Sequence, residues 1–237
     1  MLQHLYWRPA LLAIALTALT AGPASARGIE ENRETLNESI VVLESLVKGP
    51  DAEIPDQILK RAEAILIIPK LAKGGLIVGA ERGRGVFSVR DHTTGTWGVP
   101  TFMTLTGGSI GWQLGFASVD MVLLVMNRDA IDDLLDSEFT LGANASVAVG
   151  PVGRSAEAST DATLTAEILA YSRAKGLFAG LAIKGATLED NQDANASFYG
   201  KPLSAKQVIA TPSTFAVPPE IESWRKRLGA VVDSARP

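Results

Sequence analysis

Apolar residues recur at helical spacing near the start of the chain, where they predict two consecutive helices. Thr35 and Glu38 fit a capping box at the start of the first helix, and Gly49-Pro50 terminates it. A second helix is expected to begin near Pro55 and to stop before Pro69, because the residue preceding a proline disfavours helix. The stripe that defines the first helix consists of Leu36, Ile40, Leu43 and Val47.

Between Ile65 and about residue 127 the pattern changes to short, β-rich runs in which glycine is frequent. The DHTTG segment at 91–95 predicts a hairpin loop. The MVLLVM segment at 121–126 is apolar on both faces, which is typical of a central strand. The expected strand segments are 76–80, 85–91, 96–105 and 111–127.

The rest of the chain contains a short helix, further strands and a helical end. Asn127 can cap a helix over 128–137, and Arg173–Gly176 predicts the turn of a hairpin. The alanine content also permits a helix over 163–173, but the apolar run continues through the glycine turn and favours strand. Strands are expected at 145–150, 153–159 and 167–186, and helices at 191–200, 204–210 and 218–232.

These elements predict an α+β fold. A glycine-rich, mainly antiparallel β-sheet is expected to curl into a barrel or a sandwich, with helices at the N- and C-terminal ends. Glycines inside strands indicate bends, bulges or close approach of two backbones.

The first residues predict a secretory signal peptide. Arg8 precedes an apolar run over 10–21 that is too short to span a bilayer, and Ala24-Ser25-Ala26 supplies small residues for cleavage after Ala26. The expected organisation is a signal peptide (1–26), a domain that includes the N-terminal helices (27–215), and a C-terminal amphipathic helix (216–237) packed on the domain or trailing it. The product is expected to be exported, periplasmic or secreted.

Composition limits the partners and the sources of stability. The chain has no cysteine, so no disulfide braces it and no lipid can be attached through a cysteine at the cleavage site. The formal net charge of −4 argues against general binding of nucleic acid.

The GGSIG segment at 107–111 matches the pattern of a nucleophile elbow, with Ser109 as the nucleophile. A serine hydrolase needs a base, which in the α/β-hydrolase order is a histidine after the serine, but His4 and His92 both precede it. No clear helix pattern follows the motif. We therefore expect Ser109 to be structural and the chain to have no catalytic residues.

Metal and cofactor motifs are also weak. With no cysteine and two histidines, a zinc site would have to consist mostly of carboxylates, which suit zinc poorly. The acidic residues at 129–138 lack the spacing of an EF-hand loop and are interpreted as a solvated helix face. We expect no metal and no cofactor.

Basic residues are concentrated between Lys60 and Asp91, where seven cations and three acids give a local charge of +4. Several of these cations, and others later in the chain, have glycine as a neighbour. A cation beside an exposed glycine backbone suits a phosphate or carboxylate, since charge and free N–H groups can converge on the anion. The alternative interpretation is ordinary polar loop tips on a sheet.

An ordered set of short motifs runs over roughly residues 35–212. The motifs are Ile68-Pro69-Lys70, Lys73-Gly74-Gly75, Gly79 to Gly85, Trp97 with Pro100, Gly111 to Gly115, Gly150 to Arg154, Tyr171-Ser172, Lys175 to Gly180, and Asn195 with Phe198-Tyr199-Gly200. This ordered set resembles the SYLF domain family. The resemblance implies a non-catalytic module that binds lipid: eukaryotic members bind phosphoinositide membranes and in some cases actin, whereas bacterial members are exported envelope proteins.

The sequence departs from the family in its first helical segment. Residues 27–55 carry a charge of −4, which anionic lipid would repel, whereas eukaryotic members use a basic segment here. The expected partner is an anionic phospholipid or membrane surface; an envelope protein, with lipid binding incidental, is the alternative, and a hydrolase using Ser109 is a third hypothesis. The candidate headgroup contacts are Lys70, Lys73, Arg82, Arg84, Arg154 and Lys175.

Overall fold

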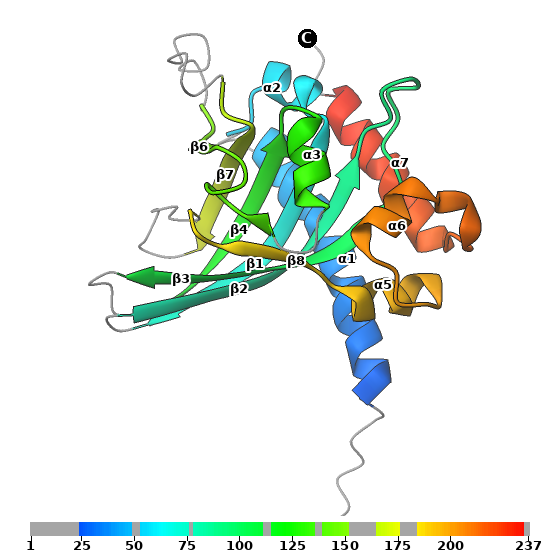
Figure 1. Ribbon diagram of the computed structural model, residues 1–237, viewed down its shortest axis with the longest axis horizontal. Coiled ribbons are helices and arrows are strands. Elements are labelled where there is room, and N and C mark those ends of the chain that lie inside the picture. The colour runs from blue at the N-terminus through cyan, green and yellow to red at the C-terminus, as the bar shows by residue number, and fades with distance from the viewer. Residues whose placement is uncertain are drawn as a thin grey trace, which may run out of the picture.

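The computed structural model describes residues 24–48, 53–75, 78–110, 115–135, 139–151, 165–175 and 184–234. It confirms the α+β fold, with a sheet that curls into a half-barrel and helices from the two ends of the chain (Figure 1). The helices are α1 (Ala24–Lys48), α2 (Asp56–Arg61), α3 (Asp129–Leu134), α5 (Gln192–Tyr199), α6 (Ala205–Ala210), the 3-10 turn η2 (Pro212–Thr214) and α7 (Pro219–Ser234).

The eight-stranded sheet is antiparallel except where β6 lies beside β7. Its spatial order is β5-β8-β3-β2-β1-β4-β7-β6, so β4, which contains the MVLLV segment, is central as predicted. The strands are β1 (Ala64–Gly75), β2 (Val78–Val89), β3 (Thr101–Ile110), β4 (Gly115–Val125), β5 (Phe139–Thr140), β6 (Val147–Val149), β7 (Ile168–Lys175) and β8 (Thr187–Asp190).

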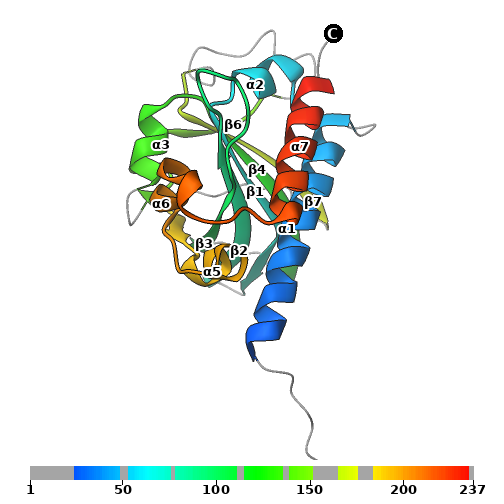
Figure 2. The same cartoon turned by 90° about the vertical axis from the view of Figure 1, so that its right-hand side faces the viewer.

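Apolar side chains cover both faces of the sheet. The inner face of the half-barrel packs around α3, with Leu66, Phe87 and Met121 among its buried residues. The outer face packs against α1 and α7, which run side by side (Figure 2), and buries Ile67 and Leu124. Burial on both faces explains why Ala64 to Ile68 form a continuous apolar run.

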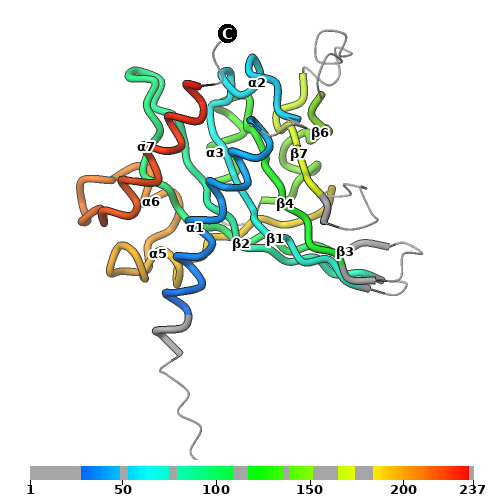
Figure 3. Tube along the Cα trace, turned by 180° about the vertical axis from the view of Figure 1, so that it is seen from behind, coloured from blue at the N-terminus to red at the C-terminus, as the bar shows by residue number. Residues whose placement is uncertain are grey.

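A β-bulge in the middle of β1 changes which side chains face the helices. Two residues, Pro69 and Lys70, lie between the pairs Ile68–Met121 and Leu71–Val119, opposite the single residue Asp120. Lys70 has a φ of 54°, and its backbone N–H donates to Asp120 Oδ1 at 3.1 Å. The extra residue reverses the alternation of side chains beyond it, as expected for a bulge. The long strands β1 and β2 extend past the part of the sheet that the helices cover (Figure 3).

Several local predictions are confirmed. Asn127 Oδ1 accepts from the N–H of Ala130 at the start of α3, and α2, α5, α6 and α7 lie where helices were expected. The loop at 91–95 connects β2 and β3. No helix among the described residues combines the length and the apolar character needed to cross a membrane.

Other predictions are wrong. Thr35 caps no helix, because α1 begins at Ala24 and the Thr35 hydroxyl donates to the carbonyl of Glu31 within that helix. Arg173 to Lys175 do not form the predicted turn, because they are the last residues of β7 and pair with β4; most of the second half of the predicted hairpin lies outside the described residues. The strand predicted at 96–105 begins only at Thr101, and β1 runs through Pro69. The strand predicted at 153–159 lies outside the described residues.

Gly150 provides a stability test of the packing beside β7. A Cβ at this position would overlap the ring of Tyr171, which is buried. Gly150→Ala is therefore expected to lower the free energy of unfolding by about 3 kcal/mol, because the ring has to move within a packed core. Thermal unfolding followed by circular dichroism measures the change.

The matched control for this substitution is Gly229→Ala. Gly229 lies inside α7 with open space around its Cα, so alanine is expected to stabilise the helix by about 1 kcal/mol. Equal stability of Gly150→Ala and the unsubstituted chain would contradict the packing of Tyr171 on this glycine.

Candidate functional site

The Arg82-Gly83-Arg84-Gly85 segment of β2 has two chemically different faces. The arginines lie on the outer face and are exposed, while the glycines lie against the inner residues of β1. A Cβ on Gly83 would lie 2.6 Å from Cγ2 of Ile68, closer than real Cβ atoms come. Close packing of β1 on β2 therefore explains these glycines, rather than the free backbone N–H groups that the sequence suggested.

The bulge brings Lys70 to the outer face, under α1. Its ammonium contacts Glu34 Oε1 at 3.0 Å and also Glu38 Oε1. The hydrogen bond to Glu38 is the largest cause that raises the pKa of Lys70, followed by the hydrogen bond to Glu34. Lys70 therefore anchors the acidic side of α1 to the sheet.

The two arginines of β2 differ in their electrostatic partners. Arg84 Nη1 lies 2.6 Å from Glu31 Oε2, again on α1. Arg82 is exposed and makes no ion pair or hydrogen bond with another described residue. Arg82 is thus the cation here whose charge is least compensated.

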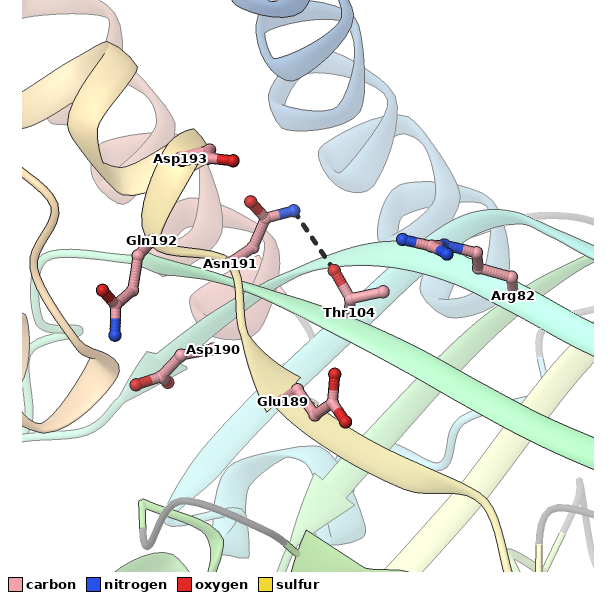
Figure 4. Close-up of a pocket in the computed structure, with 7 residues that line it drawn as sticks. All are labelled: Arg82, Thr104, Glu189, Asp190, Asn191, Gln192 and Asp193. Atoms are coloured by element: carbon pink, nitrogen blue, oxygen red, sulfur yellow. Dashed lines mark hydrogen bonds between the residues drawn. The ribbon is translucent and has the colours of Figure 1, made fainter.

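Adjoining hollows open around Arg82, and we call them together the Arg82 groove. One hollow, of about 640 Å³, lies between α1, β2 and α5 and contains Arg84, Asn191 and Asp193. A second, of about 400 Å³, contains Lys70 and the α1 glutamates. The third, of about 320 Å³, runs toward β8 and the start of α5 (Figure 4).

Strand register aligns the polar residues of the Arg82 groove. Arg84, Thr104 and Glu189 form one row across β2, β3 and β8, and Arg82 lies in the next row. Asn191 Nδ2 donates to Thr104 Oγ1 at 3.2 Å, which fixes the start of α5 beside the row (Figure 4).

Acidic residues contribute to the groove as well. Glu189, Asp190 and Asp193 line the hollow shown in Figure 4. Burial raises the pKa of Asp190, although a hydrogen bond from the backbone of Ala205 opposes this effect. The groove therefore carries both charges, and Arg82 is its cation without an ion-pair partner among the described residues.

The remaining predicted headgroup contacts lie elsewhere. The bulge turns Lys73 to the inner face, where its ammonium is 2.8 Å from Oε2 of Glu81. Register places Lys175 on β7 in the same row as Arg82, three strands away, which is roughly 14 Å. Arg154 lies outside the described residues. The structure thus brings Lys70, Arg82 and Arg84 together but not Lys73.

Thr104, Asn191 and the α1 glutamates line the groove but were not predicted from the sequence as site residues. Asn191, the first residue of the helix expected at 191–200, was a usable signal, because asparagine favours the N-cap position. The side chain of Asn191 accepts from the N–H of Ala194 in this role. No local signal linked α1 to β2.

Gly107, the first residue of the GGSIG segment, has a structural explanation. Gly107 lies opposite Glu81, and a Cβ there would be 2.7 Å from the Glu81 carboxylate, whose side chain is only 2% exposed. Gly107 therefore makes room for a buried carboxylate.

Ser109 lies within β3 rather than on a strand-to-helix turn. It is eight residues from Thr101 at the start of that strand, about 27 Å. His92 lies in the loop beyond Thr101, so the two residues do not form a nucleophile–base pair. Within the described residues, no group of three histidine or acidic side chains is arranged to hold a metal.

A curled antiparallel sheet with helices on its outer face and a groove at α1 defines a small α+β domain. A family model described as "Ysc84: Las17-binding protein actin regulator" matches residues 106–231, more than half of the chain. The chain belongs to this family, the SYLF domain family that the sequence motifs resembled.

Named relatives occur in fungi and animals. The chain is 38% identical over 179 residues to LAS seventeen-binding protein 3 of Saccharomyces cerevisiae, covering 71% of this chain and 38% of the relative. It is 37% identical to Protein YSC84 of the same yeast, covering 71% of this chain and 37% of the relative. The human SH3 domain-containing YSC84-like protein 1 is 30% identical over 162 residues, with 68% of this chain and 47% of the relative covered. The chain spans less than half the length of these relatives.

Proposed function

We propose that this domain is a non-catalytic binding module that takes an anionic lipid headgroup, or another anionic amphiphile, at Arg82 and Arg84. The observation that carries the proposal is Arg82, an exposed guanidinium with no acidic partner among the described residues, in a groove that Arg84 also lines. A guanidinium offers a fork of N–H donors that suits phosphate oxygens.

The surface beside Arg82 suits approach to a membrane. Ala72 is the partner of Arg82 on β1, and Ala80 precedes it by two residues on the same face of β2; both alanines are exposed. Because alanine side chains project little from the outer face, a headgroup can reach the guanidinium without displacing large residues.

The glutamates of α1 are expected to limit the affinity. Glu31, Glu34 and Glu38 line the hollow that holds Lys70, Arg82 and Arg84, so its formal charges sum to zero. Binding should therefore be weak and strongly dependent on ionic strength, since exposed charges are screened by salt.

A protein partner is the second candidate function. The name of the yeast relative LAS seventeen-binding protein 3 and the description of the family, "Las17-binding protein actin regulator", support it. On this alternative the domain would bind a protein at the cell envelope and lipid binding would be incidental. A purified partner that binds equally well with or without vesicles would favour it.

We also propose that the chain is exported to the periplasm or secreted, with cleavage after Ala26. The support is the sequence of residues 1–26; residues 1–23 lie outside the described part, and Ala26 lies in the first turn of α1. Mass determination of the protein recovered from a fractionated source cell tests this location, and an intact N-terminus in the cytoplasmic fraction would contradict it.

Reversing the charge of Arg82 tests the lipid proposal. Arg82→Glu is expected to weaken binding to phosphatidylcholine vesicles that contain phosphatidylglycerol by about 30-fold, since each basic residue near an anionic surface contributes about 1 kcal/mol. Vesicle flotation at low and high salt measures the loss, and vesicles of phosphatidylcholine alone should not bind.

Arg61→Glu is the matched control. Arg61 is exposed at the end of α2 and makes no ion pair with another described residue, so its reversal changes the net charge equally at a distant position. Equal losses in both variants, or undiminished binding by Arg82→Glu, would refute a headgroup site at Arg82. Release by soluble glycerol phosphate would assign the site to a free phosphate group rather than to a membrane.

A further inference from the structure

A second cleft, of about 480 Å³, lies at the opposite end of β2 from the Arg82 groove. We call it the Trp97 cleft. It lies between the β2–β3 connection (90–100), the residue before α3, and the segment from α6 to α7. The β2–β3 connection stands beside α7 (Figures 1 and 3). Arg90, which lines this cleft, is eight residues along the chain from Arg82, about 27 Å, so the two sites are separate.

Three arginines meet around Trp97 in this cleft. The Arg90 guanidinium lies over the Trp97 ring, 5.8 Å from its centroid. Arg225 Nε donates to the carbonyl of Trp97 at 3.0 Å, and Arg128 Nη2 donates to the carbonyl of Arg90 at 2.6 Å. These contacts hold the side chains in place, which reduces the entropy that a ligand would have to remove.

The cationic charge exceeds the acidic charge along the lining. Asp91 is the one acid that lines the cleft among the described residues, and its carboxylate accepts from the backbone of Thr93 and Thr94 within its own turn. Glu63 and Glu222 pair with Arg128 and Arg225 from outside the lining. Within the described residues each of these arginines uses only two of its three side-chain nitrogens in such contacts, so donors remain for a ligand.

The lining of the cleft also includes apolar residues. Ile209 and Val217 are half-buried, and Pro212 is exposed between them in sequence. A ligand that fits the whole lining needs carboxylates for the arginines and an apolar group for these residues.

We propose that the Trp97 cleft binds an acidic peptide segment of a partner protein. An extended chain spaces its side chains regularly, so a peptide of alternating acidic and apolar residues can present both kinds of side chain to this lining. Arg128 and Arg225 receive the carboxylates, and Ile209 and Val217 contact the apolar side chains.

The test uses the purified full chain and a synthetic peptide of alternating glutamate and leucine. Nuclear magnetic resonance titration is expected to shift the Trp97 indole signal and the Gly98 amide, and a peptide with glutamine in place of glutamate should bind at least about tenfold more weakly. Arg128→Gln and Arg225→Gln should each weaken the glutamate peptide about tenfold. The matched control is Arg227→Gln, an exposed arginine on α7 that pairs with Glu44 outside the cleft, and it should bind as the unsubstituted chain does.

Arg225 also holds the β2–β3 connection, so Arg225→Gln can fail to fold. In that case Arg128→Gln, at an exposed position, tests the proposal. Equal binding of the two peptides, shifts confined to other parts of the molecule, or unaltered binding by Arg128→Gln would overturn the proposal. Binding of phosphatidylglycerol vesicles that Arg128→Gln abolishes, without any binding of the peptide, would assign the cleft to lipid and also overturn it. Arg82→Glu should leave peptide binding unchanged, so this test and the headgroup test fail separately.

Discussion

Asn195→Ala is expected to lower the free energy of unfolding by about 4 kcal/mol. Asn195 lies on α5 and is fully buried against the start of β3, where its Oδ1 accepts from Phe102 N–H at 2.9 Å and from the Thr101 hydroxyl at 3.1 Å. Its Nδ2 donates to the carbonyl of Leu203 at 2.8 Å. Alanine leaves all three groups without this partner, and each buried polar group left unsatisfied costs about 1–3 kcal/mol.

Thermal and urea unfolding check this result, with Asn37→Ala as the control. Asn37 is exposed on α1 and makes no hydrogen bond through its side chain to another described residue, so the control should change stability by less than about 0.5 kcal/mol. The loss in Asn195→Ala corresponds to a fall in Tm of roughly 12 °C. If Asn195→Ala and the control had the same free energy of unfolding, the hydrogen bonds between α5 and β3 would contribute little to the stability of the fold.

The pattern of apolar residues was sufficient to predict an element where that pattern lies within the element itself. The helix expected at 218–232 is present as α7, and its apolar residues Ile221, Trp224 and Leu228 recur at helical spacing and are buried against the sheet and α1. The unbroken apolar segment at 121–126 predicted a central strand, because both of its faces had to be buried.

Long-range pairing could not be predicted in the same way. The turn predicted at Arg173–Gly176 is occupied by the last residues of β7, which pairs with β4 and β6. No local pattern in β7 specifies these partners, and partner choice depends on how the whole sheet curls.

The net charge of the candidate site also depends on long-range structure that the sequence does not reveal. The alternation of β1 would carry Lys73 to the outer face if the strand were regular, but the bulge at Pro69-Lys70 turns it to the inner face. The acids that neutralise Lys70 and Arg84 come from α1, more than 30 residues earlier. A local excess of basic residues in the sequence therefore overestimated the positive charge of the groove.

Trp224→Ala is expected to lower the free energy of unfolding by about 4 kcal/mol. The Trp224 side chain is buried between α7 and α1, and its Nε1–H donates to Ser39 Oγ at 2.8 Å. Truncation removes a large apolar surface and leaves a cavity that the two helices fill only in part, as for buried aromatic residues in general. Chemical denaturation measures the loss, and the exposed neighbour Lys226→Ala should change stability by less than about 0.5 kcal/mol.

A double-mutant cycle separates the hydrogen bond of Trp224 from its packing. The Ser39 hydroxyl donates to the carbonyl of Leu36 while it accepts from Trp224, so the two helices share one hydrogen-bonded chain. Trp224→Phe and Ser39→Ala should each destabilise the fold, and the double variant should be more stable than the sum of the two losses predicts by about 1 kcal/mol. Strict additivity would mean that only packing joins α7 to α1. In that case Trp224→Ala should still show most of its loss, because cavity formation does not depend on the indole N–H.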